Sequence, residues 1–280
     1  MTHLAPSSLK ALGEAYPDSS ALLRHNLSGH KLLQLDALAQ AAQRMKPEKV
    51  DLRLANTGNR EEADFSRVLQ GDTRADEVIR GIVDAENWVG LCNIEQLPDY
   101  RALLEEIMAE IAPATEPLTG KNLNMVGFIF ISPPHAFTPY HFDAEYNILF
   151  HIAGSKQFAT FPPSAPYIRP EIQEAYHLTG ENLLTWQDEF AEGGHVYDLE
   201  PGDALHVPYG APHWVKAGSE PCVSLSLTWH SKWSHHNCNA LKLNHALRKK
   251  GLSTFSPPAW PQSAPVRSTF YRAAHKAGLL

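Results

Sequence analysis

A histidine and an aspartate stand two positions apart in residues 138–143, which read Thr-Pro-Tyr-His-Phe-Asp. The pair follows a strand-like stretch, and side chains two positions apart on an extended chain point to the same face. His141 and Asp143 can therefore bind one metal ion. An H-x-D pair is common by chance, so this interpretation requires a third ligand from elsewhere in the chain.

His213 is the best candidate for that third ligand. Residues 201–212 contain Pro-Gly-Asp, a short apolar segment and Gly-Ala-Pro, which predict a turn, a strand and a second turn. His213 then begins a new strand, and the chain between it and His141 is long enough to cross a barrel and return. Five further histidines are expected to be structural, two in the core and three in the segment that leaves the barrel: His206, His151, His230, His235 and His236.

Two histidines and one carboxylate on one face of an octahedron leave three positions open for a co-substrate and oxygen. This arrangement favours non-haem Fe(II). Zinc bound by the same residues and a water is chemically feasible, and the sequence does not exclude it. We therefore predict a metal site of His141, Asp143 and His213, with Fe(II) as the expected ion.

The first third of the chain, which precedes these motifs, has a mainly helical pattern. Three helices are expected there, over 35–45, 75–84 and 100–112. Asp99 is the expected cap of the third helix, and Pro113 its expected stop. Residues 87–92, between the second and third helices, predict a buried strand.

The pattern changes near residue 120, where short segments rich in β-branched and aromatic residues alternate with turns. Seven strands are expected: 125–132, 146–152, 156–161, 195–199, 203–208, 213–217 and 222–229. They predict a mostly β fold, a sandwich or a barrel. A helical insert is expected over about 164–190, and helices return after Trp233. Three parts follow from this: an N-terminal mainly helical region that packs on the core (1–118), the β core (119–232) and a C-terminal helical extension (233–280).

Over residues 120–230 these motifs resemble the JmjC-type, cupin-fold oxygenases. The resemblance is strongest to the asparaginyl hydroxylase that inhibits hypoxia-inducible factor and to its bacterial cupin-like relatives. The first hundred residues are similar to the N-terminal region of those relatives. The resemblance implies a double-stranded β-helix (cupin, jelly roll) that binds Fe(II) at its mouth and uses 2-oxoglutarate as co-substrate.

The resemblance also assigns residues to the 2-oxoglutarate pocket. Thr138 matches a hydroxyl that binds the far carboxylate, Lys156 matches a lysine that pairs with it, and Asn147 matches an amide that lines the pocket. A buried dicarboxylate does need a cation at its far end; the alternative for Lys156 is a solvated turn residue. Asn147 could instead satisfy backbone groups. Thr228 stands where the family's nearest member carries an amide, a departure that concerns the positioning of co-substrate or oxygen.

The implied activity is an oxidative decarboxylation of 2-oxoglutarate coupled to hydroxylation of a substrate carbon, or to demethylation through an unstable hydroxymethyl group. A protein or peptide side chain is the leading substrate, and a small metabolite is the second. Two other classes stay open: a non-catalytic ligand-binding or regulatory cupin, and a metal cupin that does not use 2-oxoglutarate. Lys156 separates them from the oxygenase, because its position has no obvious purpose without a keto acid.

The composition, 43% apolar and 20% charged over 280 residues, is that of an ordinary globular protein. A formal net charge of −7 argues against a broad nucleic-acid-binding surface. Three scattered cysteines, no signal-peptide pattern and no apolar run of about 18 residues predict a cytoplasmic protein without a membrane span. The C-terminal helices are expected either to form a homodimer interface, as the resemblance implies, or to cap the barrel.

Overall fold

Eight short strands form the centre of the fold. The structure is a computed structural model and describes residues 2–55 and 73–279. The central strands are β4 (Leu123–Ser132), β5 (Phe137–His141), β6 (Tyr146–Ala153), β7 (Lys156–Thr160), β8 (His195–Leu199), β9 (Asp203–Val207), β10 (His213–Ala217) and β11 (Cys222–His230). All seven strands predicted for this region are present, with bounds within two residues of those expected.

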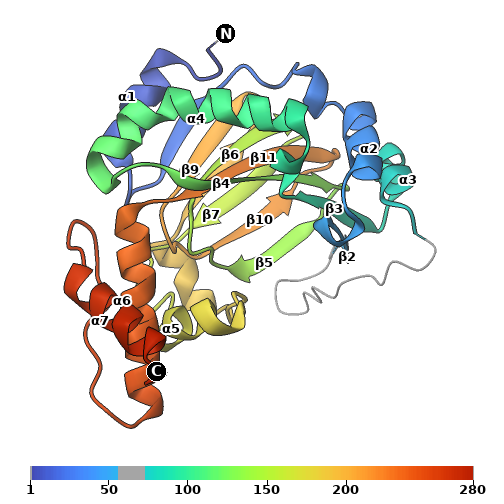
Figure 1. Cartoon of the computed structure of the whole chain (residues 1–280). Coiled ribbons are helices and arrows are strands. Elements are labelled where there is room, and N and C mark those ends of the chain that lie inside the picture. The colour runs from blue at the N-terminus through green and yellow to red at the C-terminus, as the bar shows by residue number, and fades with distance from the viewer. Residues whose placement is uncertain (1, 56–72, 280) are drawn as a thin grey trace.

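The eight strands form two antiparallel sheets that face each other, as in a jelly roll (Figure 1). Within the described residues, the smaller sheet has the order β5-β10-β7-β8. The larger sheet contains β9-β6-β11-β4 and is extended at both edges by strands of the N-terminal region. These are β1 (Ala21–Arg24), which pairs with β9, and β3 (Asn87–Cys92) and β2 (Val50–Leu54), which continue outward from β4. The predicted strand at 87–92 is confirmed.

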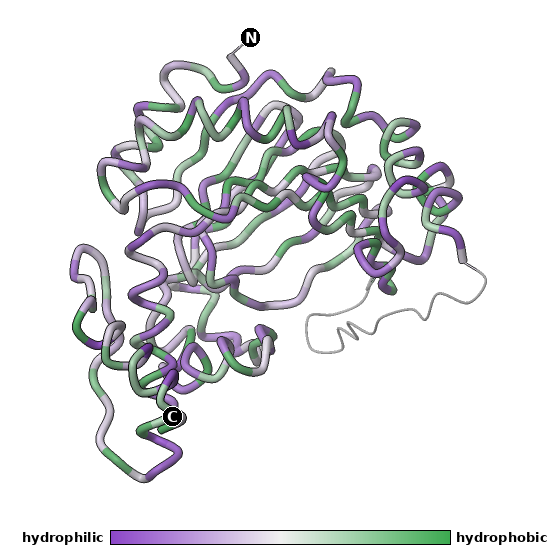
Figure 2. The backbone as a smooth tube through the Cα atoms, viewed as in Figure 1, coloured by the Kyte–Doolittle hydropathy of each residue, from purple (hydrophilic) through white to green (hydrophobic). Residues whose placement is uncertain are grey.

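Helices cover the outer face of the larger sheet. α1 (Pro6–Ala15) and α4 (Pro98–Thr119) lie across it, and α2 (Leu35–Arg44) and α3 (Ala75–Arg80) lie beside its β3–β2 edge (Figure 1). Hydrophobic and hydrophilic residues alternate along α4 (Figure 2), as expected of a helix with one buried face. Its buried residues join a large core cluster with the outward-facing side chains of the sheet, such as Ile129, Ile131 and Leu225.

The predicted end of α4 at Pro113 is wrong, because the helix continues through Pro113 and Pro117 to Thr119. A proline removes one helical hydrogen bond, but Ile111 and Thr115 are fully buried, and this packing keeps the last turns helical. The Thr115 hydroxyl also donates to the carbonyl of Ile111 at 3.2 Å.

The predicted cap of α4 is wrong as well. Leu97 occupies the N-cap position, and Asp99 lies in the first turn, where it accepts two 3.0 Å hydrogen bonds from Arg44 of α2. An acidic residue in the first turn still interacts favourably with the positive end of the helix dipole. Asp99 therefore supports the start of the helix electrostatically and ties α4 to α2.

The other helices lie near their predicted positions. The insert contains α5 (Pro170–Thr179) and a 3₁₀ helix (Asp188–Gly193), and the C-terminal extension contains α6 (Lys232–Lys249) and α7 (Pro265–Lys276). Ser231 caps α6 through a capping box with Ser234. Among the helices of residues 2–55 and 73–279, none has both the length and the apolar content that crossing a bilayer requires.

Candidate metal centre

The chain from β5 into β6 sends alternate side chains to opposite sides. Five side chains at odd-numbered positions line a cavity between the two sheets: His141, Asp143, Glu145, Asn147 and Leu149. The residues at even-numbered positions from 142 to 150 are buried on the other side: Phe142, Ala144, Tyr146, Ile148 and Phe150. The two-residue period of extended chain thus delivers both members of the H-x-D pair to one cavity.

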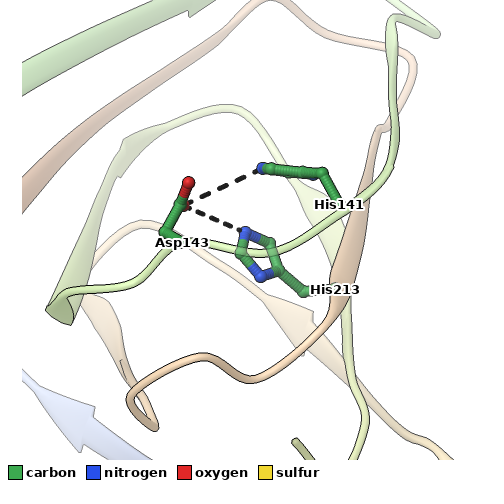
Figure 3. Close-up of side chains that lie close together, drawn as sticks. All are labelled: His141, Asp143 and His213. Atoms are coloured by element: carbon green, nitrogen blue, oxygen red, sulfur yellow. Dashed lines mark ion pairs between the residues drawn. The ribbon is translucent and has the colours of Figure 1, made fainter. Parts of the chain in front are cut away.

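Strand pairing brings His213 to the same point. His213 is the first residue of β10, and it lies directly opposite His141, the last residue of β5, in the antiparallel ladder. The Nε2 atom of His213 is 3.6 Å from Oδ2 of Asp143, and Nε2 of His141 is 3.9 Å from the same oxygen (Figure 3). The three potential ligand atoms all lie within 4.8 Å of one another. The structure therefore brings together the three residues that the sequence singled out.

Backbone carbonyls orient both imidazole rings. Nδ1 of His141 donates to the carbonyl of Pro139 at 2.7 Å, and Nδ1 of His213 donates to that of Ala211 at 2.9 Å. With the proton on Nδ1, the lone pair of each Nε2 atom faces the shared point. This is the arrangement in which histidine binds a metal, with the other ring nitrogen held by an outer partner.

His213 is the most deeply buried of the three side chains. Burial, followed by the nearby His141 ring, lowers the pKa of His213. Its ring also stacks on Phe158 of β7, with centroids 5.1 Å apart. The ring is thus neutral and held in place, which is the form that binds a cation.

The helical insert reaches back to the carboxylate of the triad. The side-chain amide of Asn182 donates to Oδ1 of Asp143 at 3.2 Å, which leaves Oδ2 toward the histidines. The backbone of the same segment pairs with β5, since Leu184 N–H donates to the Tyr140 carbonyl and Leu183 bridges His141. Sequence reasoning did not identify Asn182, and no spacing rule links the insert to the H-x-D pair.

The cavity has a volume of about 330 Å³ and lies between the sheets. Thr138 of β5 and Lys156 of β7 line it from the smaller sheet. Asn147 of β6 and Thr228 of β11 line it from the larger sheet, where they lie opposite each other. Every residue predicted for the co-substrate pocket therefore faces the same cavity as the triad.

Lys156 is the unusual member of this group, because its side chain is only 6% exposed. No ion pair of Lys156 is found within residues 2–55 and 73–279, and burial lowers the pKa of its ammonium group. A buried ammonium without a counter-ion is costly. The position is therefore not that of a solvated turn lysine, and it suits a ligand that brings its own negative charge.

The two pocket residues of the larger sheet, Asn147 and Thr228, have internal partners. Oδ1 of Asn147 accepts a 2.6 Å hydrogen bond from the Ser226 hydroxyl, so its amide nitrogen is left for the cavity. Thr228 donates to the Val126 carbonyl at 3.4 Å and also contacts the carboxyl of Glu145. Thr228 thus faces the cavity, as Asn147 does. Unlike Asn147, it contacts a carboxylate of the protein itself, that of Glu145.

Comparison with known proteins identifies the fold of the chain. No protein-family model matches the chain. The structure of YcfD from Escherichia coli superposes with a TM-score of 0.52 and 16% identity, covering 95% of this chain and 66% of that one. A second structure of YcfD, described as a ribosomal oxygenase in complex with cobalt and 2-oxoglutarate, gives 0.53 and 15%, over 99% and 68%.

The chain has the fold of a JmjC/cupin-type oxygenase. The predicted double-stranded β-helix with helices at both ends is confirmed. A JmjC domain-containing histone demethylation protein of Candida albicans is 23% identical over 146 residues, 48% of this chain and 30% of that protein. The chain thus spans about two thirds of the length of YcfD and under a third of the Candida protein.

Within this JmjC/cupin-type fold, the histidines expected in the core are there. Nδ1 and Nε2 of His151 contact the Ser224 hydroxyl and the Gly154 carbonyl at 3.2 and 2.8 Å. Nδ1 of His206 donates to the Ser19 carbonyl at 2.9 Å. Both rings are fully buried. The prediction that these two are packed core residues is confirmed.

Four aromatic residues near the motifs do not line the cavity. Tyr140 and Trp214 pack in a separate aromatic cluster on the smaller sheet. Tyr209 and Trp233 line a second cavity of about 450 Å³ beside the C-terminal helices. None of the four therefore lies in the lining of the triad's cavity.

Glu145 is a further cavity residue that sequence reasoning missed. It was detectable, since it continues the period of two from His141 through Asn147. Burial raises the pKa of Glu145, and the nearby Thr228 hydroxyl opposes that effect. Within the described residues, the ion-pair partner of Glu145 is His230, with Nε2 3.8 Å from Oε1 of Glu145.

Proposed function

We propose that this chain is an Fe(II)- and 2-oxoglutarate-dependent oxygenase. The observation that carries the proposal is the coexistence, in one cavity, of a His-Asp-His triad and a buried lysine without an anionic partner among the described residues. Either feature alone would also suit a different class of protein. Together they provide one site for a divalent cation and one for the far end of a dicarboxylate.

The donor set fits iron(II). His141 and His213 each offer an Nε2 lone pair fixed by a carbonyl on Nδ1, and Asp143 offers one carboxylate oxygen. Two imidazoles and one carboxylate with open positions are typical of non-haem Fe(II) oxygenases. The remaining Asp143 oxygen is held by Asn182, so the carboxylate would bind through one oxygen.

The inner part of the cavity fits 2-oxoglutarate. Lys156 would pair with the far carboxylate, the Thr138 hydroxyl would donate to it, and the amide nitrogen of Asn147 would line its path. The dicarboxylate would supply the charge that the buried lysine lacks. A cupin that does not use 2-oxoglutarate gives no comparable reason to bury Lys156.

When bound, iron(II) and 2-oxoglutarate would supply, together with O2, the oxidising chemistry that attacks a carbon–hydrogen bond. The protein's own residues bind and orient the two groups and exclude water from the space between the sheets. Residues 182–184 of the insert close the outer side of β5 next to Asp143. No side chain is required as a nucleophile.

A protein or peptide side chain is the proposed substrate, with a small metabolite as the second candidate. The support is the description of YcfD as a ribosomal oxygenase and of the Candida albicans relative as a histone demethylation protein. Hydroxylation is proposed as the reaction. A cytoplasmic location fits the three cysteines, all free in the structure.

The test is an anaerobic titration of Fe(II)-loaded protein with 2-oxoglutarate, monitored by the visible metal-to-ligand charge-transfer band. Wild type should give the band, and Lys156→Ala should require a much higher 2-oxoglutarate concentration. Lys216→Ala, which removes an exposed lysine of the adjacent strand β10, should titrate like wild type. No band with iron demonstrably bound would overturn the proposal in favour of a metal cupin without 2-oxoglutarate or a ligand-binding cupin.

A further inference from the structure

The second cavity, of about 450 Å³, lies on the far side of the loop that carries Asp143. Phe142 and Ala144, the neighbours of Asp143 in the chain, line this second cavity, whereas Asp143 itself lines the cavity between the sheets. Gly210, whose N–H donates to the Asp143 carbonyl at 3.0 Å, also lines the second cavity. The two cavities therefore share one wall, the chain at 142–144.

The other walls of the second cavity come mainly from α5, α6 and residues 257–260 of the C-terminal extension. Arg248 of α6 donates a 2.9 Å hydrogen bond to the buried Glu174 of α5, and the two helices pack together (Figure 1). The amide nitrogen of Asn237 on α6 donates to the Pro258 carbonyl at 2.8 Å. These contacts hold the walls in place, so the cavity is preformed, as small-molecule sites usually are.

Flat apolar side chains make up much of the lining. The rings of Trp233 and Trp260 meet there, with centroids 6.0 Å apart at an angle of 68°, and the ring of Phe142 lies in the same lining. Prolines such as Pro163 and Pro257 add rigid surface. Flat rings suit a planar apolar ligand, and the volume lies within the range of about 300–1,000 Å³ that is usual for small-molecule pockets.

Three polar groups of this lining have no hydrogen-bond partner within residues 2–55 and 73–279: the Tyr209 hydroxyl, the His177 imidazole and Oδ1 of Asn237. Asn237 is the most informative of the three, because it is only 6% exposed and its amide nitrogen is already used by Pro258. Buried polar atoms are normally hydrogen-bonded. The cavity therefore suits an occupant that brings partners for them.

The protonation states of these groups define the occupant further. Burial raises the pKa of Tyr209 well above its usual range and lowers the pKa of His177 from 6.5 to about 4, so both are neutral at pH 7. Each can donate or accept a hydrogen bond, whereas Oδ1 of Asn237 can only accept. The described lining contains no lysine or arginine, and its one carboxylate is that of the exposed Asp18, so an anionic ligand is disfavoured.

We infer that the second cavity is a binding site for a small neutral aromatic molecule that carries an N–H or O–H donor. The rings of Trp233 and Trp260 would contact its flat body, and Oδ1 of Asn237 would accept its hydrogen bond. The site involves neither the metal nor 2-oxoglutarate, so the inference does not depend on the proposed function. Its occupant would contact Phe142 and Ala144, directly behind a metal ligand.

The test is a titration of the full chain with indole and with benzofuran, followed by ligand-observed NMR. Benzofuran has the size and shape of indole but an oxygen in place of the N–H group. Wild type should bind indole about fivefold more tightly than benzofuran, as expected for one hydrogen bond. Asn237→Leu, which keeps the size of the side chain but has no acceptor, should bind the two probes equally.

Asn239→Leu is the matched control. Asn239 lies on the same helix and also donates to the C-terminal extension, with its amide nitrogen 2.9 Å from the Ser268 hydroxyl, but it is not part of the cavity lining. This variant should keep the preference for indole. Circular dichroism shows whether each variant is folded.

A second variant locates the probe without breaking the hydrogen bond to Pro258. Trp260→Leu removes one ring of the wall and should weaken the binding of indole and of benzofuran alike, by about fivefold. Unchanged affinities in this variant would place the probes elsewhere and overturn the inference.

The wild-type titrations are decisive even if Asn237→Leu does not fold. No binding of indole overturns the inference, and so does equal binding of indole and benzofuran, which would mean that ordered water satisfies Asn237 instead. A preference for indole that survives in folded Asn237→Leu overturns it as well. A preference that is present in wild type and Asn239→Leu and lost in Asn237→Leu supports it.

Discussion

The side-chain amide of Asn182 donates a hydrogen bond to Oδ1 of Asp143 across 39 positions of the chain. The two residues come from different parts of the fold, the insert and the loop after β5. Because the bond occupies one carboxylate oxygen, it fixes the orientation in which the other oxygen faces His141 and His213. The insert therefore contributes to the geometry of the metal site without offering a ligand.

We expect Asn182→Ala to bind Mn(II) or Fe(II) about tenfold more weakly than wild type, as is usual when a partner of a ligand is removed. The measurement is a competition titration against a chelator, with circular dichroism to check folding. Glu181→Ala, an exposed neighbour in the same segment, is the control. Equal affinities in all three proteins would show that Asn182 does not position Asp143.

The sequence was sufficient to predict the triad because its geometry follows from local rules. The two-residue period places His141 and Asp143 on one face, and the turn before His213 starts a strand that pairs opposite His141. Lys156 starts β7, which lies in the other sheet from β6 and pairs with β10 and β8, so its position in the cavity follows from those pairings and not from a hairpin with β6. Glu145 obeys the same period and could have been predicted with Asn147.

Other features depend on tertiary packing that no local pattern records. Asn182 and Tyr176 reach the cavity from an insert whose path is set by its contacts with β5 and α6. Pro113 ends a helix in most contexts, but burial of Ile111 and Thr115 outweighs the lost hydrogen bond here. β1 has only four residues, too few to show a period, and it is ordered by its pairing with β9.

Two buried histidines on consecutive strands of the chain, His206 of β9 and His213 of β10, allow a direct test of the metal assignment. His213→Ala should abolish tight Fe(II) binding, because it removes one of three ligands. His206→Ala removes an imidazole that is equally buried but contacts Ser19 and the ring of Tyr16 instead. It should lower the free energy of unfolding by a few kcal/mol, about the cost of truncating a large core side chain, yet leave the metal bound.

The test is the metal content of the two purified variants after reconstitution. It is measured by inductively coupled plasma mass spectrometry. Thermal unfolding shows that each is folded. Full occupancy in His213→Ala would mean that the ion binds elsewhere. Loss of metal in a folded His206→Ala protein would assign that histidine a role that its contacts do not suggest.

His206 should make the metal-free protein less stable in mild acid. Burial lowers its pKa from 6.5 to about 4, because a proton on Nε2 would find no acceptor there. Between these values the unfolded chain binds the proton and the folded chain does not, so stability falls as the pH drops from 6.5 toward 4. From pH 7 to pH 5 this one group should cost about 2 kcal/mol.

Urea unfolding of metal-free protein at pH 7 and pH 5 measures this cost. In His206→Gln, which retains a donor for the Ser19 carbonyl, the loss of stability over the same interval should be smaller by about 2 kcal/mol. His275→Gln, at an exposed position of α7, should behave like wild type. The same pH dependence in all three proteins would mean that His206 does not titrate as its burial predicts.

Lys156 is expected to lower the stability of the ligand-free protein. Its ammonium group is buried without an anion among the described residues, and replacing such a charge with an apolar side chain of similar length often stabilises a fold. Lys156→Met should therefore raise the free energy of unfolding by about 1–3 kcal/mol in the absence of 2-oxoglutarate. It should at the same time abolish the stabilisation that 2-oxoglutarate gives to the Mn(II)-loaded wild type.

The two effects have opposite signs, which separates a ligand-binding lysine from a structural one. A lysine that only supports packing would make Lys156→Met less stable and leave the response to 2-oxoglutarate intact. If Lys156 binds a dicarboxylate, Lys156→Met should be more stable than wild type without 2-oxoglutarate and should not be stabilised further when 2-oxoglutarate is added. Thermal unfolding of both proteins, with Mn(II) and with increasing 2-oxoglutarate, measures both effects, and Lys216→Met reports what loss of a surface lysine does by itself.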